Sequence, residues 1–473
     1  MTRASRQIIQ RALTQLGRAT GTQPQNARLS VRAQNLTLGT RFRAAEAASA
    51  ALLAGASEAD QIARLRGQAP SRISLSTRHA EASLLSFMFL QFANAAEAPA
   101  ARIAPEERTA AAGFYPTADD RWIYLHSGFP HNTAGLLKLL GARDDREAVA
   151  AAVRASKGQE LENLIAEAGL CGAMVRSPRE WDESAAGQLL ASSPIVEIIQ
   201  TGDSPPEPFP ADADRPLAGS RVLDLTRILA GPTCARTLAS YGAGVLRVGA
   251  RHLPSIPLFV ADTGFGKRST HLNLMSKRGK TRMRGLIRQS DVFSQGYRSG
   301  AMDRLGFGVN EVTRLRPGIV YVSINCYGHE GPWRARPGWE QLAQTVTGMA
   351  AIQGEDFHGG LPQLLPAAVT DYTTGYLAAL GALSALRRRS THGGSYWVRV
   401  SLARTGAWIR GLGTRSTLDA SPLSQAELAR LRSRTQSAWG AIDYLRPAVE
   451  LSASAVRWEL PPVPLGTHPP EFD

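Results

Sequence analysis

The chain has 473 residues, 43% of them hydrophobic, which is enough for about two or three domains with proper cores. Its formal net charge is +14, and arginine supplies most of it because only five lysines occur. No window of about eighteen apolar residues exists, so we expect no membrane-spanning helix. Cys171, Cys234 and Cys326 are widely spaced, which argues against disulfides or a cysteine-pair metal site and favours a reducing, cytoplasmic compartment.

The basic charge has two interpretations. A basic chain can bind nucleic acid or another polyanion, or the arginines can record a GC-rich genome and be scattered over solvated faces. The sequence has no run of five like charges, no zinc-finger spacing and no aromatic–glycine RNA signature. We therefore expect no nucleic-acid partner, while a polyanionic small molecule would need only a local basic cluster.

The N-terminal half begins with 45 residues that contain eight arginines and no acid. Ile8, Ile9, Leu13 and Leu16 have helical spacing, so this segment imitates a mitochondrial transit peptide, although we favour an ordinary N-terminal helix. After it the pattern predicts, in order, a helix over about 40–66, a strand over 72–76, a helix over about 78–94, a strand over 122–126 and three helices up to about residue 190.

A proline-rich segment over 201–218 separates this half from the next, and it predicts an extended linker. Val222–Leu225 then has the apolar run of a buried parallel strand, a helix follows from Ala230, and Val245–Val248 predicts a second strand. Strand, helix and strand form a βαβ unit, which places ligands beyond the carboxyl ends of its strands.

The rest of the second half predicts strands over about 291–294 and 319–324, a long helix over about 372–388 and a strand over 398–402. Residues 414–473 are expected to form an extended tail. A weak internal repeat relates the two halves, because residues 71–83 resemble 396–408 and an alanine-rich helix precedes each. Counted back without gaps, Asp371 then falls opposite Glu46; chance similarity between two such helix–strand pairs is the alternative.

Asp371 is the candidate catalytic residue. An apolar segment delivers its carboxylate to the start of a helix, where helix N–H groups stabilise a negative charge. A positioned, desolvated carboxylate can attack a thioester, whereas Thr-Asp before a helix can also be an ordinary N-cap.

Five segments of the second half resemble family III CoA-transferases, the group that holds formyl-CoA and carnitine CoA-transferases and α-methylacyl-CoA racemase. They are RVLDLTRILAGPTCARTLASYGAGVLRV (221–248), GKRS (266–269), QGYRSGAMDRLG (295–306), and the pair YGHEGPW and RPGWE within 327–340. YPTADDRW (115–122) resembles a later part of that family. The order is therefore that of a permuted or duplicated family member.

The resemblance implies an acyl-CoA and a carboxylic acid as substrates. Asp371 would attack the thioester, giving an enzyme anhydride and then an aspartyl-CoA thioester. The implied CoA-binding residues are Lys267, Arg268, Tyr297, Ala301, Arg304 and Arg251, and the implied substrate pocket contains Leu229, Ala230, Trp339 and Glu340. No metal and no permanently bound cofactor are implied. Known members form dimers, so a homodimer is expected, unless the permuted order lets one chain complete its own contacts.

Two departures from the family bear on the activity. Trp339 stands where the racemase branch has a histidine, and moving a proton α to a thioester needs two titrating groups, so CoA transfer is favoured over racemisation. The stretch Ala110–Gly113 has one glycine where formyl-CoA transferases have a glycine-rich lid. A CoA-ester isomerase or racemase-like enzyme and a non-catalytic CoA-binding protein remain the alternatives.

We therefore expect an α/β fold: a Rossmann-like, mostly parallel sheet in the C-terminal half and a mixed α/β N-terminal half resembling the family's C-terminal portion. The expected divisions are 1–200 for the N-terminal half, 201–218 for the linker, 219–413 for the CoA-binding half with the nucleophile, and 414–473 for the tail. The expected protein is a bacterial, cytoplasmic enzyme that needs neither nucleic acid nor membrane.

Overall fold

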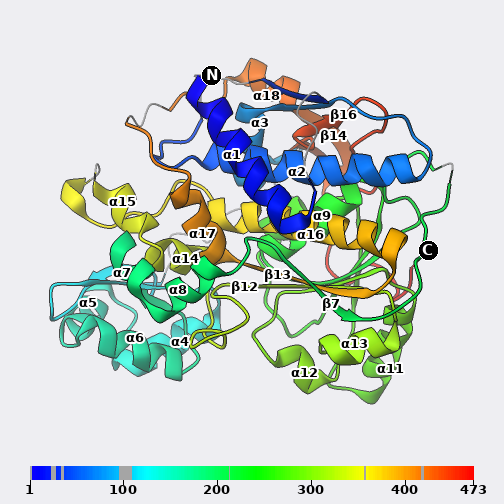
Figure 1. Cartoon of the computed structure of the whole chain (residues 1–473). Coiled ribbons are helices and arrows are strands. Elements are labelled where there is room, and N and C mark those ends of the chain that lie inside the picture. The colour runs from blue at the N-terminus through cyan, green and yellow to red at the C-terminus, as the bar shows by residue number, and fades with distance from the viewer. Residues whose placement is uncertain are drawn as a thin grey trace.

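The structure is a computed structural model, and it describes residues 3–22, 28–32, 37–94, 109–211, 213–355, 358–416 and 420–472. The described part is mixed α/β, as expected, and its elements are arranged as Figure 1 shows. Among the described helices, none is both long and apolar enough to cross a membrane.

A seven-stranded sheet forms the centre of the molecule. Its order is β10 (Lys267–His271), β9 (Gly244–Gly249), β8 (Arg221–Leu225), β11 (Val292–Gln295), β12 (Val320–Asn325), β13 (Ser395–Ser401) and β7 (Glu197–Gly202). All neighbours are parallel except β13 and β7. From β8 the chain builds outward through β9 and β10, then crosses to β11, β12 and β13. The order therefore reverses between β8 and β11, the point where open α/β sheets bind ligands.

Both faces of this sheet are covered, which explains why apolar residues of its central strands are buried on both sides. On β8, Val222 belongs to the large core that includes α9 (Ala230–Ser240) and α16 (Val369–His392), whereas Leu223 belongs to the core beneath α11 (Lys277–Arg288) and α13 (Val309–Leu315). Shorter helices on this half are α10 (Pro257–Thr263), α12 (Ala301–Leu305), α14 (Glu340–Val346), α15 (Met349–Glu355), α17 (Leu402–Gly411) and the 3₁₀ turn η4 (His358–Gly360).

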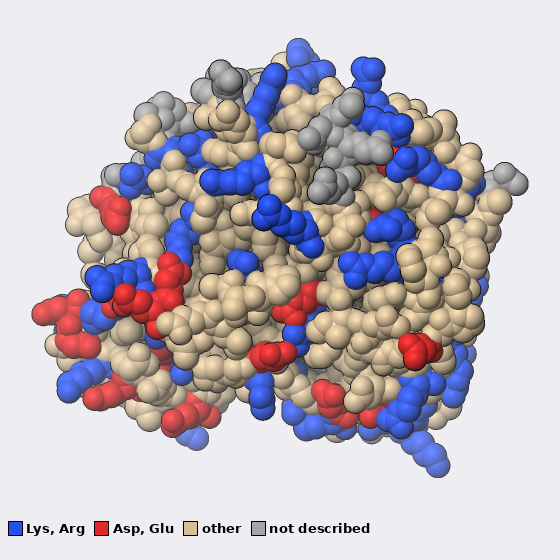
Figure 2. Space-filling view, viewed as in Figure 1, with Lys and Arg blue, Asp and Glu red and all other residues tan. Residues whose placement is uncertain are grey.

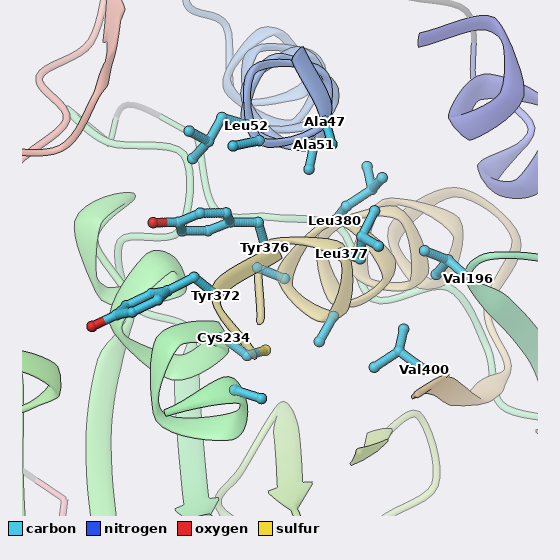
Figure 3. Packing of buried hydrophobic residues seen from close by; sticks show 14 of the residues in the cluster. Ala47, Ala51, Leu52, Val196, Cys234, Tyr372, Tyr376, Leu377, Leu380 and Val400 are labelled. Carbon is cyan, nitrogen blue, oxygen red and sulfur yellow. The ribbon is translucent and has the colours of Figure 1, made fainter. Parts of the chain in front are cut away.

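The N-terminal half packs over α16. Its elements here are α1 (Arg3–Thr20), β1 (Leu29–Arg32), α2 (Ala44–Leu65), β2 (Ile73–Ser76), α3 (Thr77–Ala82), the 3₁₀ helix η2 (Ser83–Phe89) and β3 (Gln91–Phe92). Figure 3 shows Ala47 and Ala51 of α2 facing Leu377 and Leu380 of α16, with α9 on the other side of α16. Small alanines bring α2 close, so three helices form a continuous core.

The internal repeat has a structural counterpart. Helix, strand and helix follow one another as α2, β2 and α3 in the first half and as α16, β13 and α17 in the second. Glu46 is the third residue of α2, and Asp371 is the third residue of α16. This shared helical position favours the repeat over chance similarity.

A smaller lobe lies beside the large sheet and has its own core. It contains β4 (Gly113–Pro116), β5 (Trp122–Leu125), β6 (Gly172–Met174), α4 (Pro130–Leu140), α5 (Arg146–Arg154) and α6 (Gly158–Glu167). The next helices, α7 (Pro178–Glu183) and α8 (Ala185–Ser192), pack instead against the large core. The sequence predicted three helices after residue 126, whereas the structure has five helices and a strand. β6 is too short for a detectable period, and serine caps at Ser177 and Ser184 divide the last helical stretch.

The extended tail expected over 414–473 is wrong for residues 425–451. They fold into α18 (Gln425–Leu431), β14 (Arg432–Ser437), β15 (Gly440–Leu445) and β16 (Val449–Leu451). β14 is polar throughout and is held by pairing with β15, so no alternation of apolar residues marks it. Residues 452–472 are irregular. Within them, residues 466–468 lie against the edge strand β10: the His468 N–H donates to the Ser269 carbonyl over 2.7 Å, and the Gly466 N–H donates to the Ser269 hydroxyl.

On the face that Figure 2 shows, the basic residues are scattered over the surface, as the second interpretation of the net charge expects. Basic residues are spread across that face, and acidic ones gather at its lower left, over the smaller lobe. No single basic stripe crosses this view.

Candidate active site

A cavity of about 380 Å³ opens at the reversal point of the seven-stranded sheet. Its walls come from the turn after β8, the loop after β11, the segment that enters α14, and the first turn of α16. The smaller lobe closes it with Phe129, His131, Asn132 and Cys171. Residues from both halves therefore build one site.

Asp371 lies in this cavity and is not the cap of its own helix. The N–H groups of Thr370 and Asp371 donate instead to the Glu340 carboxylate, over 3.0 and 2.5 Å. Glu340 also accepts from Thr370 Oγ1 and from Gln344. Among the residues that the structure describes, none donates a hydrogen bond to the Asp371 side chain, which is 6% exposed. Its carboxyl is therefore available to a ligand.

The two carboxyls differ in how they bear a negative charge. Burial raises the pKa of Asp371 well above its usual range, and the neighbouring Glu340 raises it further. Burial also raises the pKa of Glu340, but the hydrogen bonds from Thr370, Gln344 and Asp371 oppose that rise. Since hydrogen bonds to a carboxylate favour its ionised form, the proton of the pair belongs on Asp371.

The turn between β8 and α9 is strained where it meets the cavity. Ile228 has φ of 70°, a left-handed conformation that is unusual for a β-branched residue. Such strain persists only where the surrounding structure enforces it, and it concentrates at functional sites. Behind the turn, α16 approaches α9 closely, because a Cβ on Gly375 would lie 2.5 Å from the Ala230 carbonyl oxygen.

Most of the residues expected at the site line this cavity. They are Leu229, Ala230, Tyr297, Ala301, Arg304, Trp339, Glu340 and Asp371. Residues 110–113, where the resemblance expected a lid, do not line it; Ala111 is fully buried in the core of the smaller lobe.

Lys267, Arg268 and Arg251 do not line the cavity. The first two belong to β10, because residues 267–271 pair in register with β9. The Lys267 ammonium is buried and bonds to Asp224 and to the Pro232 carbonyl, both over 2.8 Å, and burial lowers its pKa to about 8. Arg251 is exposed in the loop after β9.

Sequence reasoning missed several lining residues. Arg227 places its guanidinium over the Phe129 ring, 4.9 Å from the centroid, and so links the two halves. Asn132 is 2% exposed, and its Oδ1 has no hydrogen-bond partner. No local pattern distinguishes these residues, because their role arises from contact between segments about a hundred residues apart. Among the described residues, no cluster of metal-ligating side chains occurs.

Comparison with known proteins gives a family match for the second half. The sequence model of CoA-transferase family III matches residues 217–434. An "Acyl-CoA transferase" of Gibberella moniliformis is 36% identical over 318 residues, covering 62% of this chain and 55% of that protein. The "Acetyl-coenzyme A transferase nodX" of Hypoxylon pulicicidum is 33% identical over 395 residues, covering 74% of this chain and 66% of that protein.

Among solved structures, a CaiB/BaiF family protein from Brucella suis is 22% identical over 48% of this chain and 65% of that chain, with a TM-score of 0.39. This chain thus spans 55% to 66% of the length of the two fungal relatives. Both relatives are fungal and give no support to a bacterial source. The second fungal alignment covers more of the chain than residues 219–473 could supply, so it extends into the N-terminal half.

Proposed function

Because residues 217–434 belong to CoA-transferase family III, we propose that this protein transfers CoA from an acyl-CoA to a carboxylic acid, with Asp371 as the nucleophile. The names of the relatives support the reaction class. The observation that carries the proposal is the arrangement of Asp371: its carboxyl lies in a cavity between both halves, while Glu340 takes over the capping of α16.

In the proposed reaction, CoA moves first from the donor acyl group to the Asp371 carboxyl and then from Asp371 to the acceptor acid. The ionised Asp371 carboxylate attacks the thioester carbonyl carbon, and the CoA thiolate leaves as a mixed anhydride forms. The thiolate then attacks the Asp371 carbonyl carbon, which releases the first carboxylate and leaves an aspartyl-CoA thioester. The acceptor carboxylate attacks the carbonyl carbon of that thioester, which expels the CoA thiolate and forms a second anhydride. The thiolate then attacks the acceptor's carbonyl carbon, which gives the new acyl-CoA and regenerates the Asp371 carboxylate.

The free enzyme must lose the Asp371 proton before the first attack. The raised pKa of this group makes its carboxylate a stronger nucleophile once it is ionised, and the low exposure of Asp371 limits access of water to the anhydride. We assign the CoA side of the cavity to Tyr297, Ala301 and Arg304, which follow β11 at the reversal point. Lys267 would act indirectly, since its ion pair with Asp224 lies under the β8–α9 turn.

The test is capture of the covalent intermediate. The protein is incubated with a panel of acyl-CoAs, treated with hydroxylamine, and digested for mass spectrometry. We expect a hydroxamate on the Asp371 peptide in wild type and none in Asp371→Asn. Unmodified Asp371 across the panel, in a protein that binds CoA, would refute the nucleophile assignment.

The same samples separate the alternatives. Exchange of the α-proton of an acyl-CoA into deuterated water, without movement of CoA between acids, would indicate an isomerase or racemase-like enzyme. CoA binding with neither exchange nor hydroxamate would indicate a non-catalytic binding protein. We favour transfer because the names of the relatives give that reaction class, and because Trp339 stands where the racemase branch has a histidine.

A homodimer and a cytoplasmic location remain predictions. Phe129, Asn132 and Cys171 of the same chain line the cavity, which favours a chain that completes its own site. Sedimentation of the purified protein measures the oligomeric state. The three cysteines are free and buried, which suits a reducing compartment.

A further inference from the structure

A smaller pocket opens beside the cavity and shares Arg227, Ile228 and Leu253 with it. It has a volume of about 20 Å³ and lies between the carboxyl end of β9, the β8–α9 turn and α10. Arg227 and Arg247 line it, and no acidic residue is among its described lining residues. The pocket is therefore positively charged and continuous with the substrate cavity.

Arg247 is unusual among the buried arginines. Seven arginines in the described residues are buried, namely Arg66, Arg78, Arg176, Arg215, Arg236, Arg247 and Arg389. Six of them donate hydrogen bonds to carbonyl, hydroxyl or carboxylate oxygens. Arg247 is 5% exposed, yet no described residue accepts a hydrogen bond from its guanidinium or forms an ion pair with it.

The nearest acid cannot neutralise Arg247. Asp224 is its partner in the β8–β9 register. One Asp224 oxygen is bound by the Lys267 ammonium, and the other accepts from the N–H and hydroxyl of Thr226. Arg227 adds a further positive charge at the mouth of the pocket. Asp224, Lys267, Arg247 and Arg227 thus leave an excess of positive charge, which is costly to keep buried without an anion.

We propose that Arg247, assisted by Arg227, forms a subsite for an anionic group of the substrate, a phosphate or a carboxylate, that enters from the cavity. A planar guanidinium suits such groups because it donates two parallel hydrogen bonds. The pocket by itself holds little more than a water molecule, so only the charged end of the ligand enters it. The identity of the ligand as an acyl-CoA or its acid rests on the proposed function.

The first test compares Arg247→Met with a buried, paired control, Arg176→Met, whose guanidinium bonds to Glu162 outside the cavity. Removing an unpaired charge is expected to leave the melting temperature of the free protein unchanged or higher, and to weaken CoA binding about tenfold to a hundredfold. Arg176→Met is expected to lower the melting temperature and leave CoA affinity unchanged. An Arg247→Met protein that melts earlier than wild type, fails to fold, or binds every ligand with wild-type affinity overturns the proposal.

Binding is measured by titration calorimetry in the Asp371→Asn background, where no covalent step occurs. A loss confined to CoA and absent for dephospho-CoA assigns the subsite to the 3′-phosphate. A loss for both, but not for pantetheine, assigns it to the diphosphate. A loss for succinate, with CoA affinity retained, assigns it to a carboxylate. Since these titrations need no nucleophile, they can succeed where the hydroxamate test fails.

Discussion

At the scale of single residues, the reaction depends on which of two neighbouring carboxyls holds a proton. Glu340 accepts hydrogen bonds from two backbone N–H groups, a hydroxyl and an amide, whereas Asp371 accepts none from described residues. The cap on α16 therefore keeps Glu340 ionised, and the charge of Glu340 in turn holds the pKa of Asp371 high. Capping and nucleophile activation are coupled through one side chain.

Glu340→Gln tests this coupling. The amide oxygen can still accept from the Thr370 N–H, but the negative charge is gone, so the pKa of Asp371 falls. We expect the acid limb of the kcat/KM profile to move to lower pH by about one unit. The limb is measured with a single acyl-CoA over the range in which the variant stays folded. An unmoved limb would mean that burial alone sets the pKa.

Glu46 and Asp371 form a matched pair of carboxyls, each the third residue of a long helix. Glu46 accepts from Ser5 over 2.9 Å and from Arg415 over 2.7 Å, with Arg43 at 3.4 Å. The equivalent position in the first half is therefore closed by ion pairs and hydrogen bonds, while the one in the second half is open to a ligand.

The pair predicts opposite outcomes for isosteric changes. Glu46→Gln removes the carboxylate that forms ion pairs with Arg415 and Arg43, so we expect a loss of about 3–5 kcal/mol in the free energy of unfolding, with near-normal turnover at permissive temperature. Asp371→Asn should reduce turnover about a thousandfold or more and cost little stability. Denaturant unfolding measures the stability of both variants, and CoA-transfer assays measure their turnover. Equal effects of the two variants on stability and turnover would contradict the prediction.

The stability difference at Asp371 also depends on pH. A folded-state pKa above the unfolded value means that the protonated form is favoured in the fold. The contribution of Asp371 to stability is therefore fully present below its unfolded pKa and is lost as pH rises through the raised folded pKa. Asp371→Asn lacks that loss and should become the more stable protein on the alkaline side. Equal pH dependence of the two proteins would contradict a raised pKa.

At the scale of elements, the position of Asp371 follows from the contact between α9 and α16. Gly375, one helical turn after Asp371, lets α16 approach the Ala230 carbonyl at the start of α9. Ala230 itself lines the cavity, so this contact fixes the distance between the nucleophile and the β8–α9 turn.

Gly375→Ala should move the two helices apart. The added methyl would meet backbone at 2.5 Å, and we expect a loss of about 1–3 kcal/mol in the free energy of unfolding together with reduced kcat. Gly285→Ala in α11 is the control, because nothing lies within 4 Å of its new methyl. Removing a mid-helix glycine there should stabilise by about 0.5–1 kcal/mol without changing kcat. A Gly375→Ala protein that behaves like this control would show that the contact is slack.

The sequence was most informative where one element determined its own pattern. The apolar run of β8, the glycines that follow α9 and the long alanine-rich helix α16 could all be predicted, and with them the βαβ unit. The role of Asp371 rests on the family resemblance and stays a prediction. Lys267 could not be placed, since its burial results from pairing of β10 with β9 and from an ion pair with Asp224 on a third strand. The strand β14 could not be predicted for the same reason, because its polar residues form a strand only by pairing with β15.

At the scale of the whole molecule, the site exists only because the two halves meet. Phe129, Asn132 and Cys171 come from the smaller lobe, and Arg227 reaches across to the Phe129 ring. No property of the individual segments indicates such a meeting, because it depends on contacts between segments far apart in sequence. The environment of Arg247 could not be predicted from the sequence for the same reason, because the residues around it in the chain are those of an ordinary strand.

The C-terminal segment over 452–472 gives a prediction at this scale. A chain ending at Leu460 keeps Trp458 packed on Phe265 but loses the residues that bond to β10. We expect the truncated protein to self-associate more strongly as its concentration rises, which light scattering measures. The molecules that stay monomeric should keep a nearly normal turnover rate. Thr467→Ala removes only a hydroxyl that bonds to Pro464, keeps both bonds between His468 and Ser269, and should stay monodisperse. A truncated chain that scatters no more than this control would exclude a protective role.

The wider consequence concerns how an open sheet stays dispersed in a crowded solution. β10 ends the sheet on one side, and a bare edge of that kind is a template for docking another strand. This chain covers the edge with its own last residues, without forming a further strand. A fusion partner or affinity tag that displaced those residues from β10 should therefore lower the yield of dispersed protein before it lowers the turnover rate.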